Sequence, residues 1–152
     1  GNFIFASTTD RTIKISSEML SCGANLPRIM DNTLRNKNLP ALKIWGKAMS
    51  RTNINKKYNI AFTALTLDDI GDLDEEDLEG IPNFLGNLRN VKAVMIVREQ
   101  KDGTIKGSFR SAHPDTNVAK LARALGGGGH VKAAGFTIEG RLEMMDGGWK
   151  VI

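Results

Sequence analysis

The sequence predicts an α/β protein, in which a mixed β-sheet domain flanked by helices spans residues 53–152 and follows a helical segment, residues 1–52. Two observations carry this prediction. Up to about residue 52 the apolar residues recur at helical spacing, and beyond it they alternate or form runs of strand length. In the second part, helix-spaced segments lie between the strand-like ones.

Three helices are predicted in residues 1–52. The first ends at Gly23, the second begins at Asn25 with Pro27, and the third begins at Pro40. Their predicted inward residues are Thr12, Ile15, Met19 and Cys22; Ile29, Met30, Thr33 and Leu34; and Ala41, Leu42, Trp45, Ala48 and Met49. Three short helices without a strand do not form a convincing core. We therefore interpret the segment as the end of a domain whose beginning is absent, and the start at Gly1 points the same way.

Strands dominate from Asn53 onward. One predicted strand has alternating inward residues, which are Tyr58, Ile60, Phe62 and Ala64. A short helix near residues 82–89 precedes the apolar run "VKAVMIVRE", which is predicted to be a central strand. The dipeptide Asp102-Gly103 then predicts a tight turn, so that residues 91–111 form a hairpin.

One more helix and two more strands complete the predicted domain. Asp115 is the expected N-cap of the helix, whose inward residues are Val118, Leu121, Ala122 and Leu125. "AAGFTIEG" and "RLEMMDGGWKVI" are predicted as two further strands joined by a glycine-containing turn. The last segment, residues 141–152, is not distinctive and its role is not predicted.

Cysteine content and hydropathy indicate a cytoplasmic protein. The single cysteine, Cys22, excludes an internal disulfide and suits a reducing compartment. Because Cys22 lies among apolar residues, it is predicted to be a small buried side chain rather than a nucleophile. No apolar run approaches the roughly 20 residues needed to cross a bilayer, and no signal peptide is visible, so no membrane partner is expected.

The net charge of +4 is distributed unevenly. Residues 1–58 hold ten basic and three acidic side chains, whereas residues 68–79 hold eight of the seventeen acidic residues. The acidic run is predicted to be a solvated loop and helix start. The basic remainder favours a polyanionic partner such as nucleic acid or a nucleotide.

Four consecutive glycines precede His130 in "ALGGGGHVKAAGF", residues 124–136. Glycine is favoured just past the end of a helix, but one glycine is enough for that purpose. Ordering four of them costs conformational entropy, which suggests a second interpretation. In this interpretation the glycines form a turn whose backbone comes very close to another group, with His130 at its edge.

The predicted chain order brings Arg110 and Ser111 close to the glycines. Arg110 offers a planar fork of donors that suits a phosphate or a carboxylate, and Ser108 and Ser111 can add hydroxyl groups. Exposed glycine amides can bind anionic oxygens, and His130 can donate to a phosphate or stack on a base. A short helical turn in "HVKAA" would add N-terminal amides. The structural alternatives are an exposed strand-end arginine and a packed loop histidine.

Other chemistries fit less well. The run "GGGGH" is not followed by the Gly-Lys-Ser/Thr of a P-loop. Two histidines and one cysteine (His113, His130 and Cys22) show no zinc-ligand spacing, and no nucleophile elbow is present. The sequence therefore predicts a binding site and no catalytic centre.

The run "GSFRSAHPDTNVAKLARALGGGGHVKAAGFTI" resembles the signature of the DHH-associated domain, the second domain of DHH phosphoesterases. The acidic stretch, "GIPNFL" and "VKAVMIV" resemble the first half of that domain. "GNFIFASTT" is similar to the segment after the last metal-binding aspartate of the DHH domain, and "LPALKIWGKAM" resembles the interdomain connection. The resemblance implies that residues 1–52 are closing helices of a truncated DHH domain and that residues 53–152 are the substrate-binding domain.

The resemblance implies a metal-dependent phosphoesterase as the full-length protein. In that family the DHH domain binds two manganese ions, and the associated domain holds the distal nucleotide across a cleft. By matching positions, the substrate-binding residues are Arg110, Ser111, Gly127, Gly128, Gly129 and His130, and Ser108 joins them from the strand reasoning above. The Asp-His-His motif is absent from this sequence, and residues 1–52, which resemble the DHH domain, contain no Asp-x-Asp motif. No catalytic residue, metal ligand or cofactor is therefore expected in this chain, and no hydrolysis by it alone.

Several specific assignments stay open at this point. The motifs are most similar to the branch of nanoRNases, phosphoadenosine phosphatases and cyclic dinucleotide phosphodiesterases, with a RecJ-type exonuclease or an alanyl-tRNA synthetase domain as alternatives. The expected partners are short RNA, a dinucleotide or phosphoadenosine phosphate, and the protein's own N-terminal DHH domain; a homodimer is left open. The rival hypotheses are a stand-alone nucleic-acid-binding module without catalysis and a vestigial site retained for packing.

Overall fold

A computed structural model describes residues 8–33, 37–145 and 148–152, and the chain divides into two compact units, residues 1–37 and 38–152. The first unit contains helices α1 (Asp10–Ser21) and α2 (Leu26–Thr33). The Thr9 side chain caps α1, and Gly23 ends the segment with a φ of +94°. Asn25 begins the second helix as expected, because its Oδ1 accepts from the backbone N–H of Arg28 at 3.0 Å.

The predicted inward faces of these two helices are not buried. No side chain of α1 is buried, and Ile15, Met19, Ile29 and Cys22 are all exposed. The prediction of a buried Cys22 is therefore wrong. Two short helices cannot cover each other's apolar stripes in the absence of a sheet or a third layer. Leu34, a predicted inward residue, and the motif in residues 1–7 lie outside the described residues.

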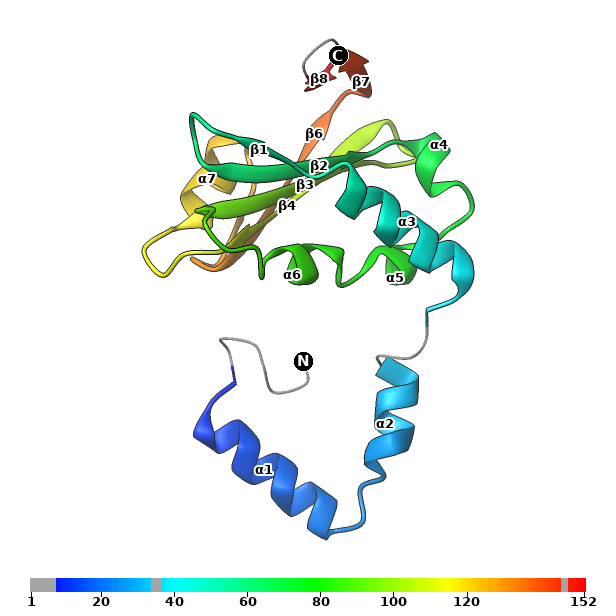
Figure 1. Ribbon diagram of the computed structural model, residues 1–152, viewed down its shortest axis with the longest axis vertical. Coiled ribbons are helices and arrows are strands. Elements are labelled where there is room, and N and C mark those ends of the chain that lie inside the picture. Colours follow the sequence, from blue (N-terminus) through cyan, green and yellow to red (C-terminus); the bar gives the residue numbers. More distant parts are fainter. Residues whose placement is uncertain (1–7, 34–36, 146–147) are drawn as a thin grey trace. The chain divides into compact units, whose positions relative to one another are not determined.

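The second unit is built on one six-stranded sheet with the order β1-β2-β3-β4-β6-β5 (Figure 1). The strands are β1 (Asn53–Asn55), β2 (Ile60–Leu65), β3 (Ala93–Glu99), β4 (Thr104–Ser111), β5 (Gly128–Gly129) and β6 (Ala133–Glu139). β2 and β3 are parallel, whereas the other neighbours are antiparallel. The predicted mixed sheet, its central strand and the hairpin through Gly103 are confirmed. Tyr58 is not in a strand, because it lies in the turn that joins β1 to β2.

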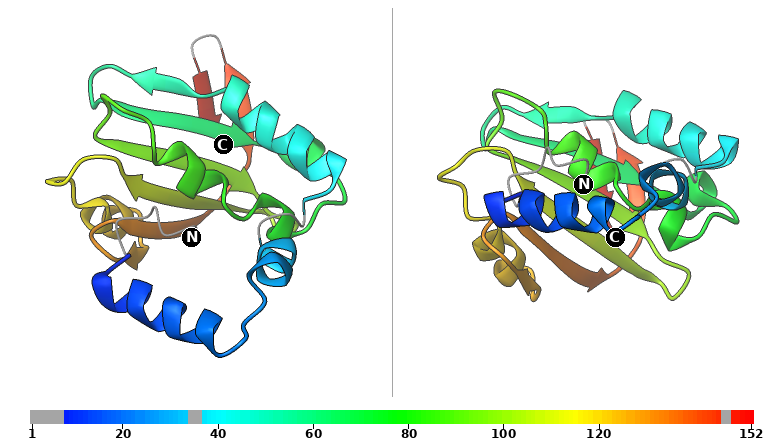
Figure 2. Two further views of the ribbon diagram at one scale, coloured as in Figure 1. Left: turned by 60° about the horizontal axis from the view of Figure 1, so that its bottom comes forward. Right: turned by 90° about the horizontal axis from the view of Figure 1, so that it is seen from below.

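Helices cover both faces of the sheet (Figures 1 and 2). One face carries α3 (Leu39–Ser50), α5 (Glu75–Leu78) and α6 (Ile81–Leu85), with α4 (Leu67–Ile70) beside them. The other face carries α7 (Val118–Ala124), which packs on β4, β5 and β6. Each face has its own apolar core. The first includes Ile44, Leu65, Ile81, Val94 and Ile96, and the second includes Ala64, Ile105, Phe109, Val118 and Phe136.

Two predicted helix faces are confirmed only in part. Ala41, Ala48, Val118 and Ala122 are buried as predicted, and Trp45 and Met49 are partly buried against the first core. In α3 the buried residues are Ala41, Ile44 and Ala48, and Leu42 is exposed. In α7 the buried residues are Val118, Ala119 and Ala122, whereas Leu121 and Leu125 are exposed. Small residues face the sheet because they let the helix axis approach the strands closely.

The start of α7 also differs from the prediction. Its N-cap is Asn117, whose Oδ1 accepts from the backbone N–H of Ala119 at 3.1 Å, and not Asp115. The backbone N–H of Val118 donates to the carbonyl of Val131 at 3.0 Å. This long-range hydrogen bond fixes the first residue of the helix. The local sequence pattern does not indicate such a bond, because its two partners are far apart in the sequence.

Strands β7 (Leu142–Met145) and β8 (Gly148–Val151) pair as a separate, antiparallel two-stranded sheet near the C-terminus. Residues 146–147, within the predicted glycine turn, lie outside the described residues. The backbone N–H of Leu142 donates to Oε1 of Glu99 at 2.7 Å. The guanidinium of Arg51 lies 5.5 Å from the centre of a Trp149 ring, and together these contacts join the two-stranded sheet to the rest of the unit.

Part of the acidic run is built into the fold and is not solvated as predicted. The Asp69 side chain is only 5% exposed and forms ion pairs with Lys47, at 2.6 Å, and with Arg51. Burial by itself would raise the pKa of Asp69. Hydrogen bonds from Lys47, from the backbone of Thr66 and from Arg51 outweigh burial and lower the pKa to about 2.

Candidate functional site

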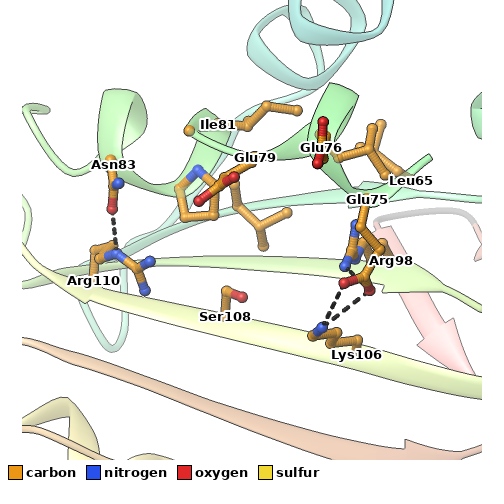
Figure 3. A pocket seen from close by; sticks show the side chains of 14 residues that line it. Leu65, Glu75, Glu76, Glu79, Ile81, Asn83, Arg98, Lys106, Ser108 and Arg110 are labelled. Carbon is orange, nitrogen blue, oxygen red and sulfur yellow. Dashed lines mark hydrogen bonds and ion pairs between the residues drawn. The ribbon is translucent and has the colours of Figure 1, made fainter. Parts of the chain in front are cut away.

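Strand β4 presents its polar side chains on one face of the sheet. Successive side chains of a strand point to opposite faces, so Lys106, Ser108 and Arg110 share a face, while Gly107 and Phe109 face α7. The polar face borders a cleft of about 400 Å³, closed on the other side by α5 and α6 (Figure 3). Its lining residues are Leu65, Glu75, Glu76, Leu78, Glu79, Gly80, Ile81, Pro82, Asn83, Ile96, Arg98, Lys106, Ser108 and Arg110.

Arg110 lies at one end of this cleft and is held by neutral oxygens. Its Nε donates to Oδ1 of Asn83 at 2.6 Å, and its Nη1 donates to the Phe109 carbonyl at 2.9 Å. Burial lowers the pKa of the Arg110 guanidinium, which nevertheless stays cationic at neutral pH. Among the described residues it has no carboxylate partner, and Figure 3 shows the guanidinium directed into the cleft toward Ser108.

Two further cations lie at the other end of the cleft and share one carboxylate. Oε1 of Glu75 accepts from Nη2 of Arg98 at 2.5 Å and from Nζ of Lys106 at 3.0 Å. The hydrogen bond from Lys106 and the charge of Arg98 lower the pKa of Glu75. The cleft therefore has one cation without a carboxylate partner at one end and, beyond Ser108, two cations that share a single carboxylate.

The four glycines combine both of their predicted roles. Gly126, with a φ of +76°, follows the end of α7. Gly128 and Gly129 then form β5, a short edge strand paired with β6. A Cβ on Gly127 would lie 2.1 Å from the Gly135 carbonyl oxygen, and one on Gly129 would lie 2.6 Å from Cα of Ala134. The group that the glycine backbone approaches closely in this structure is thus the neighbouring strand.

His130 lies at the turn that joins β5 to β6. Its backbone N–H donates to the Ala133 carbonyl at 2.8 Å, and the Ala133 N–H donates back at 3.2 Å. Residues 130–133 therefore form a tight hairpin turn into β6, and the helical turn considered for "HVKAA" does not form. Ala133 also pairs with Arg110, which places Arg110, Ala133 and His130 in line across three strands. The backbones of Arg110 and His130 are thus about 10 Å apart, two strand spacings.

The structure brings some of the predicted site residues together and separates others. Ser108 borders both the cleft and a second hollow of about 360 Å³, whose other lining residues are Lys106, Gly107, Gly126, Gly127, Gly135, Phe136 and Thr137. Ser111 does not line the cleft. Its hydroxyl donates to the His113 carbonyl at 2.7 Å, and its backbone N–H donates to the Lys132 carbonyl at 3.0 Å. A one-residue step along β4 from Arg110 reverses the face.

Three residues of the cleft, Asn83, Arg98 and Lys106, were not predicted from the sequence. Lys106 could have been found, because it lies two and four residues before Ser108 and Arg110 on a predicted strand. Asn83 comes from α6 and Arg98 from β3. Their positions depend on how these elements pack, so no local sequence signal indicates them.

The described part of the chain contains neither a cluster of metal ligands nor a membrane-spanning helix. No three His, Cys, Asp or Glu side chains there are grouped so that they could hold a metal ion. Nor does any helix in residues 8–33, 37–145 or 148–152 have the length and apolar character required to cross a membrane. The described residues therefore do not fit the manganese pair that the resemblance implies for the full-length protein.

Comparison with known proteins agrees with this architecture. Residues 57–147 match the DHHA1 domain. This chain belongs to the DHHA1 domain family. The match includes β2, the cleft helices, β4 and the glycine strand, so all the residues described above as bordering the cleft lie within the DHHA1 domain.

Two relatives carry the name "bifunctional oligoribonuclease and PAP phosphatase NrnA". The protein from Thermus thermophilus is 30% identical over 143 residues, which cover 92% of this chain and 41% of the relative. The protein from Bacillus subtilis is 29% identical over 140 residues, which cover 91% of this chain and 43% of the relative. The DHHA1 chain thus spans about two fifths of the length of these relatives.

A solved structure shares the fold. An exopolyphosphatase-related protein from Bacteroides fragilis superposes with a TM-score of 0.79 at 29% identity, over 95% of this chain and 42% of that one. The expected relationship to DHH-family phosphoesterases and the expected fold class are confirmed. The division at residues 52 and 53 stays a prediction. In the structure α3 packs on β2 as part of the unit that begins at Asn38.

Proposed function

We propose that this chain is the substrate-binding domain of a DHH-family phosphoesterase acting on short RNA, a dinucleotide or phosphoadenosine phosphate. The names of the NrnA relatives, an oligoribonuclease and PAP phosphatase, support this substrate class. The observation that carries the proposal is Arg110, a half-buried cation fixed by two neutral oxygens and directed into an open cleft. Such a guanidinium is ready to receive a phosphate without first losing a carboxylate.

The other residues of the site extend the same role. Ser108 can donate its hydroxyl to a phosphate oxygen beside Arg110. Gly127 borders the adjoining hollow with its backbone, and the absence of a side chain lets that backbone lie close against β6. His130, in line with Arg110 across Ala133, is placed to donate to a second group of the ligand or to stack on its base. The domain binds and orients the nucleotide, and we assign no hydrolytic step to its residues.

Catalysis in this proposal belongs to the whole enzyme. Manganese held by a DHH domain would activate the water that attacks the phosphoester. The whole protein is proposed to be cytoplasmic, with its own DHH domain as the partner of this one. Cleavage of a dinucleotide by the purified 152-residue chain with manganese, above a buffer control, would contradict this division of roles.

Binding of the dinucleoside monophosphate ApA, followed by amide NMR with EDTA present, tests the proposal. We expect a dissociation constant near 1 mM, about −4 kcal/mol, because the DHH domain that is proposed to hold the other part of the substrate is not in this chain. Peaks from residues 108–111 and 126–130 should shift. Arg110→Ala should weaken binding at least about tenfold, since it removes a charge-assisted contact to phosphate.

Arg123→Ala is the matched control. Arg123 is exposed on α7, which covers the opposite face of the sheet, and its removal changes the net charge equally. We expect the control to bind ApA within about twofold of the original chain. Equal losses of affinity in both variants would show that ApA binding depends on the net charge of the chain and not on the Arg110 site. Shifts confined to residues 10–33 would place the site elsewhere.

A further inference from the structure

We propose that Arg98 and Lys106 form a second phosphate subsite, which the Glu75 carboxylate occupies until an oligoribonucleotide longer than a dinucleotide displaces it. This inference rests on the proposed function, because it extends the Arg110 site along β4. It names the longer RNA as the ligand that uses the whole cleft. Neither Arg98 nor Lys106 was among the residues that the family motif indicated.

Glu75 marks the position of an anion. Its Oε1 lies 2.5 Å from Nη2 of Arg98 and 3.0 Å from Nζ of Lys106, and its Oε2 lies 3.4 Å from the same Nζ. One oxygen thus accepts from a guanidinium and an ammonium at once. A phosphate oxygen makes the same kind of contacts with these two groups. The two cations are therefore already arranged around an oxyanion.

The carboxylate can leave at little cost. The Glu75 side chain is 66% exposed, and it begins α5, a helix of only four residues. Exposed ion pairs contribute little to stability, because water solvates the separated charges well. Arg98, by contrast, is only 16% exposed and sits on a central strand. Arg98 is thus the partner that the fold holds in place, and the exposed Glu75 carboxylate is the replaceable one, with Lys106, 40% exposed, beside them.

The second subsite continues the first one. Lys106 and Arg110 are four residues apart on β4, about 13 Å along the strand, with Ser108 between them on the same face. Figure 3 shows Lys106 directed toward Glu75 and Arg110 directed toward Ser108, at opposite ends of the cleft. When one phosphate of an RNA ligand lies at Arg110, the Arg98–Lys106 pair is therefore available to another phosphate of the same RNA molecule. A ligand with a single phosphate cannot engage both ends in this way.

The test compares two RNA ligands that differ in phosphate number. ApA carries one phosphate, and the tetranucleotide ApApApA carries three. Dissociation constants are measured with the 152-residue chain at low salt in EDTA, by calorimetry or NMR, for the original chain and for Glu75→Gln. We expect Glu75→Gln to bind ApApApA about three- to tenfold more tightly and ApA within about twofold. For ApApApA, the plot of log K against log salt should be steeper for Glu75→Gln than for the original chain. The expected difference in slope is about 0.7, which corresponds to one added phosphate contact.

Glu79→Gln is the matched control, because Glu79 lines the same cleft, is exposed and forms no ion pair among the described residues. It removes the same charge and should change the ApApApA constant by less than about twofold. Adding Lys106→Gln to Glu75→Gln should abolish the gain. Equal gains in Glu75→Gln and Glu79→Gln, an equal gain on ApA, or no gain at all would overturn the second subsite.

Arg110→Ala separates this inference from the proposed function. If Arg110→Ala weakens ApA but Glu75→Gln leaves ApApApA unchanged, the second subsite is wrong and the first one stands. If Arg110→Ala leaves both ligands unchanged, the proposed function itself fails. Thermal unfolding of each variant shows whether it is folded. Glu75→Gln is expected to be, because the side chain is exposed and the replacement has the same shape.

Discussion

Two carboxylates of the same acidic run, Asp69 and Glu75, make the same kind of interaction in opposite surroundings. Each accepts from one lysine and one arginine, Asp69 from Lys47 and Arg51, and Glu75 from Lys106 and Arg98. Asp69 is 5% exposed and Glu75 is 66% exposed. The two carboxylates differ in their surroundings more than their cations do. Asp69 is enclosed by protein and Glu75 is solvated, whereas the cations are partly exposed in both cases (Lys47 45%, Arg51 28%, Lys106 40% and Arg98 16%).

The comparison shows that burial decides what a carboxylate between two cations does. Asp69 joins α3 to the start of α4, where it also accepts from the backbone N–H of Thr66 at 3.0 Å. Its loss should therefore affect stability. Glu75 faces a cleft, and its loss should affect ligand binding instead. Variants at the two carboxylates and at the Arg110 end of the cleft can strengthen or break this distinction.

The largest expected effect is on folding. Asp69→Ala should lower the free energy of unfolding by about 3 kcal/mol, because it removes a buried ion-pair partner and a helix-capping contact together. Urea denaturation of the purified chain measures this. Asp68→Ala, the exposed neighbour in α4, is the control and should cost less than about 0.5 kcal/mol. Similar midpoints for the two variants would show that Asp69 does not hold the fold.

Acid should also lower the free energy of unfolding by protonating Asp69, although by less than Asp69→Ala does. The pKa of Asp69 is about 2 in the folded chain, against an ordinary value of 3.8. Because the folded-state pKa is the lower one, the stabilisation is complete above about pH 5 and is lost as the pH falls from about 4 to 2. The loss should be about 2 kcal/mol. Denaturation curves at pH 5, 4, 3 and 2 should show this fall in the original chain and a weaker one in Asp69→Ala.

Asn83→Asp should make the Arg110 end of the cleft resemble the Glu75 end. The replacement keeps the shape of the side chain but gives Arg110 a carboxylate partner in place of a neutral amide oxygen. We expect ApA to bind about three- to tenfold more weakly at low salt. Asn87→Asp is the control, because Asn87 lies just after α6 and its side chain donates to the backbone carbonyls of Asn83 and Phe84 in that helix. An unchanged ApA constant for Asn83→Asp would mean that the neutral partner does not matter.

The smallest expected effect is on folding again. Glu75→Gln should change the free energy of unfolding by less than about 0.5 kcal/mol, because the Glu75 side chain is 66% exposed and the glutamine oxygen can still accept from both cations. The same urea experiment measures this change. A loss approaching that of Asp69→Ala would make Glu75 a structural residue and remove the contrast between the two carboxylates.

The periodicity of the sequence predicted most elements of the second unit because their burial follows local spacing. It failed where burial depends on a partner from elsewhere in the chain. Cys22 and Ile15 have apolar neighbours at helical spacing, yet nothing described in the first unit covers them. Leu121 and Leu125 were expected inside, but α7 turns its alanines to the sheet. Asp69 was expected in solvent, but two cations, Lys47 of α3 and Arg51 just after it, meet it.

The candidate site divides in the same way. Arg110, Ser108 and the glycines stand out in the sequence, because a strand-end arginine and a glycine run are unusual locally. Ser111 was predicted as a hydroxyl donor beside Arg110 and also through the motif, although the two-residue repeat of a strand places it on the other face from Arg110. Asn83 and Arg98 were missed, because α6 and β3 meet β4 only after the sheet has formed.

The sequence by itself determined the fold class, the family and the strand that carries Arg110, since alternation along a strand and a contiguous motif are properties of neighbouring residues. Only the tertiary structure decided which charged side chains form ion pairs and which are available to a ligand. That depends on the distance between groups from different elements and on the water around them. Asp69 and Glu75 look alike in the sequence, and their different exposure arises solely from how α3, α5 and the sheet pack.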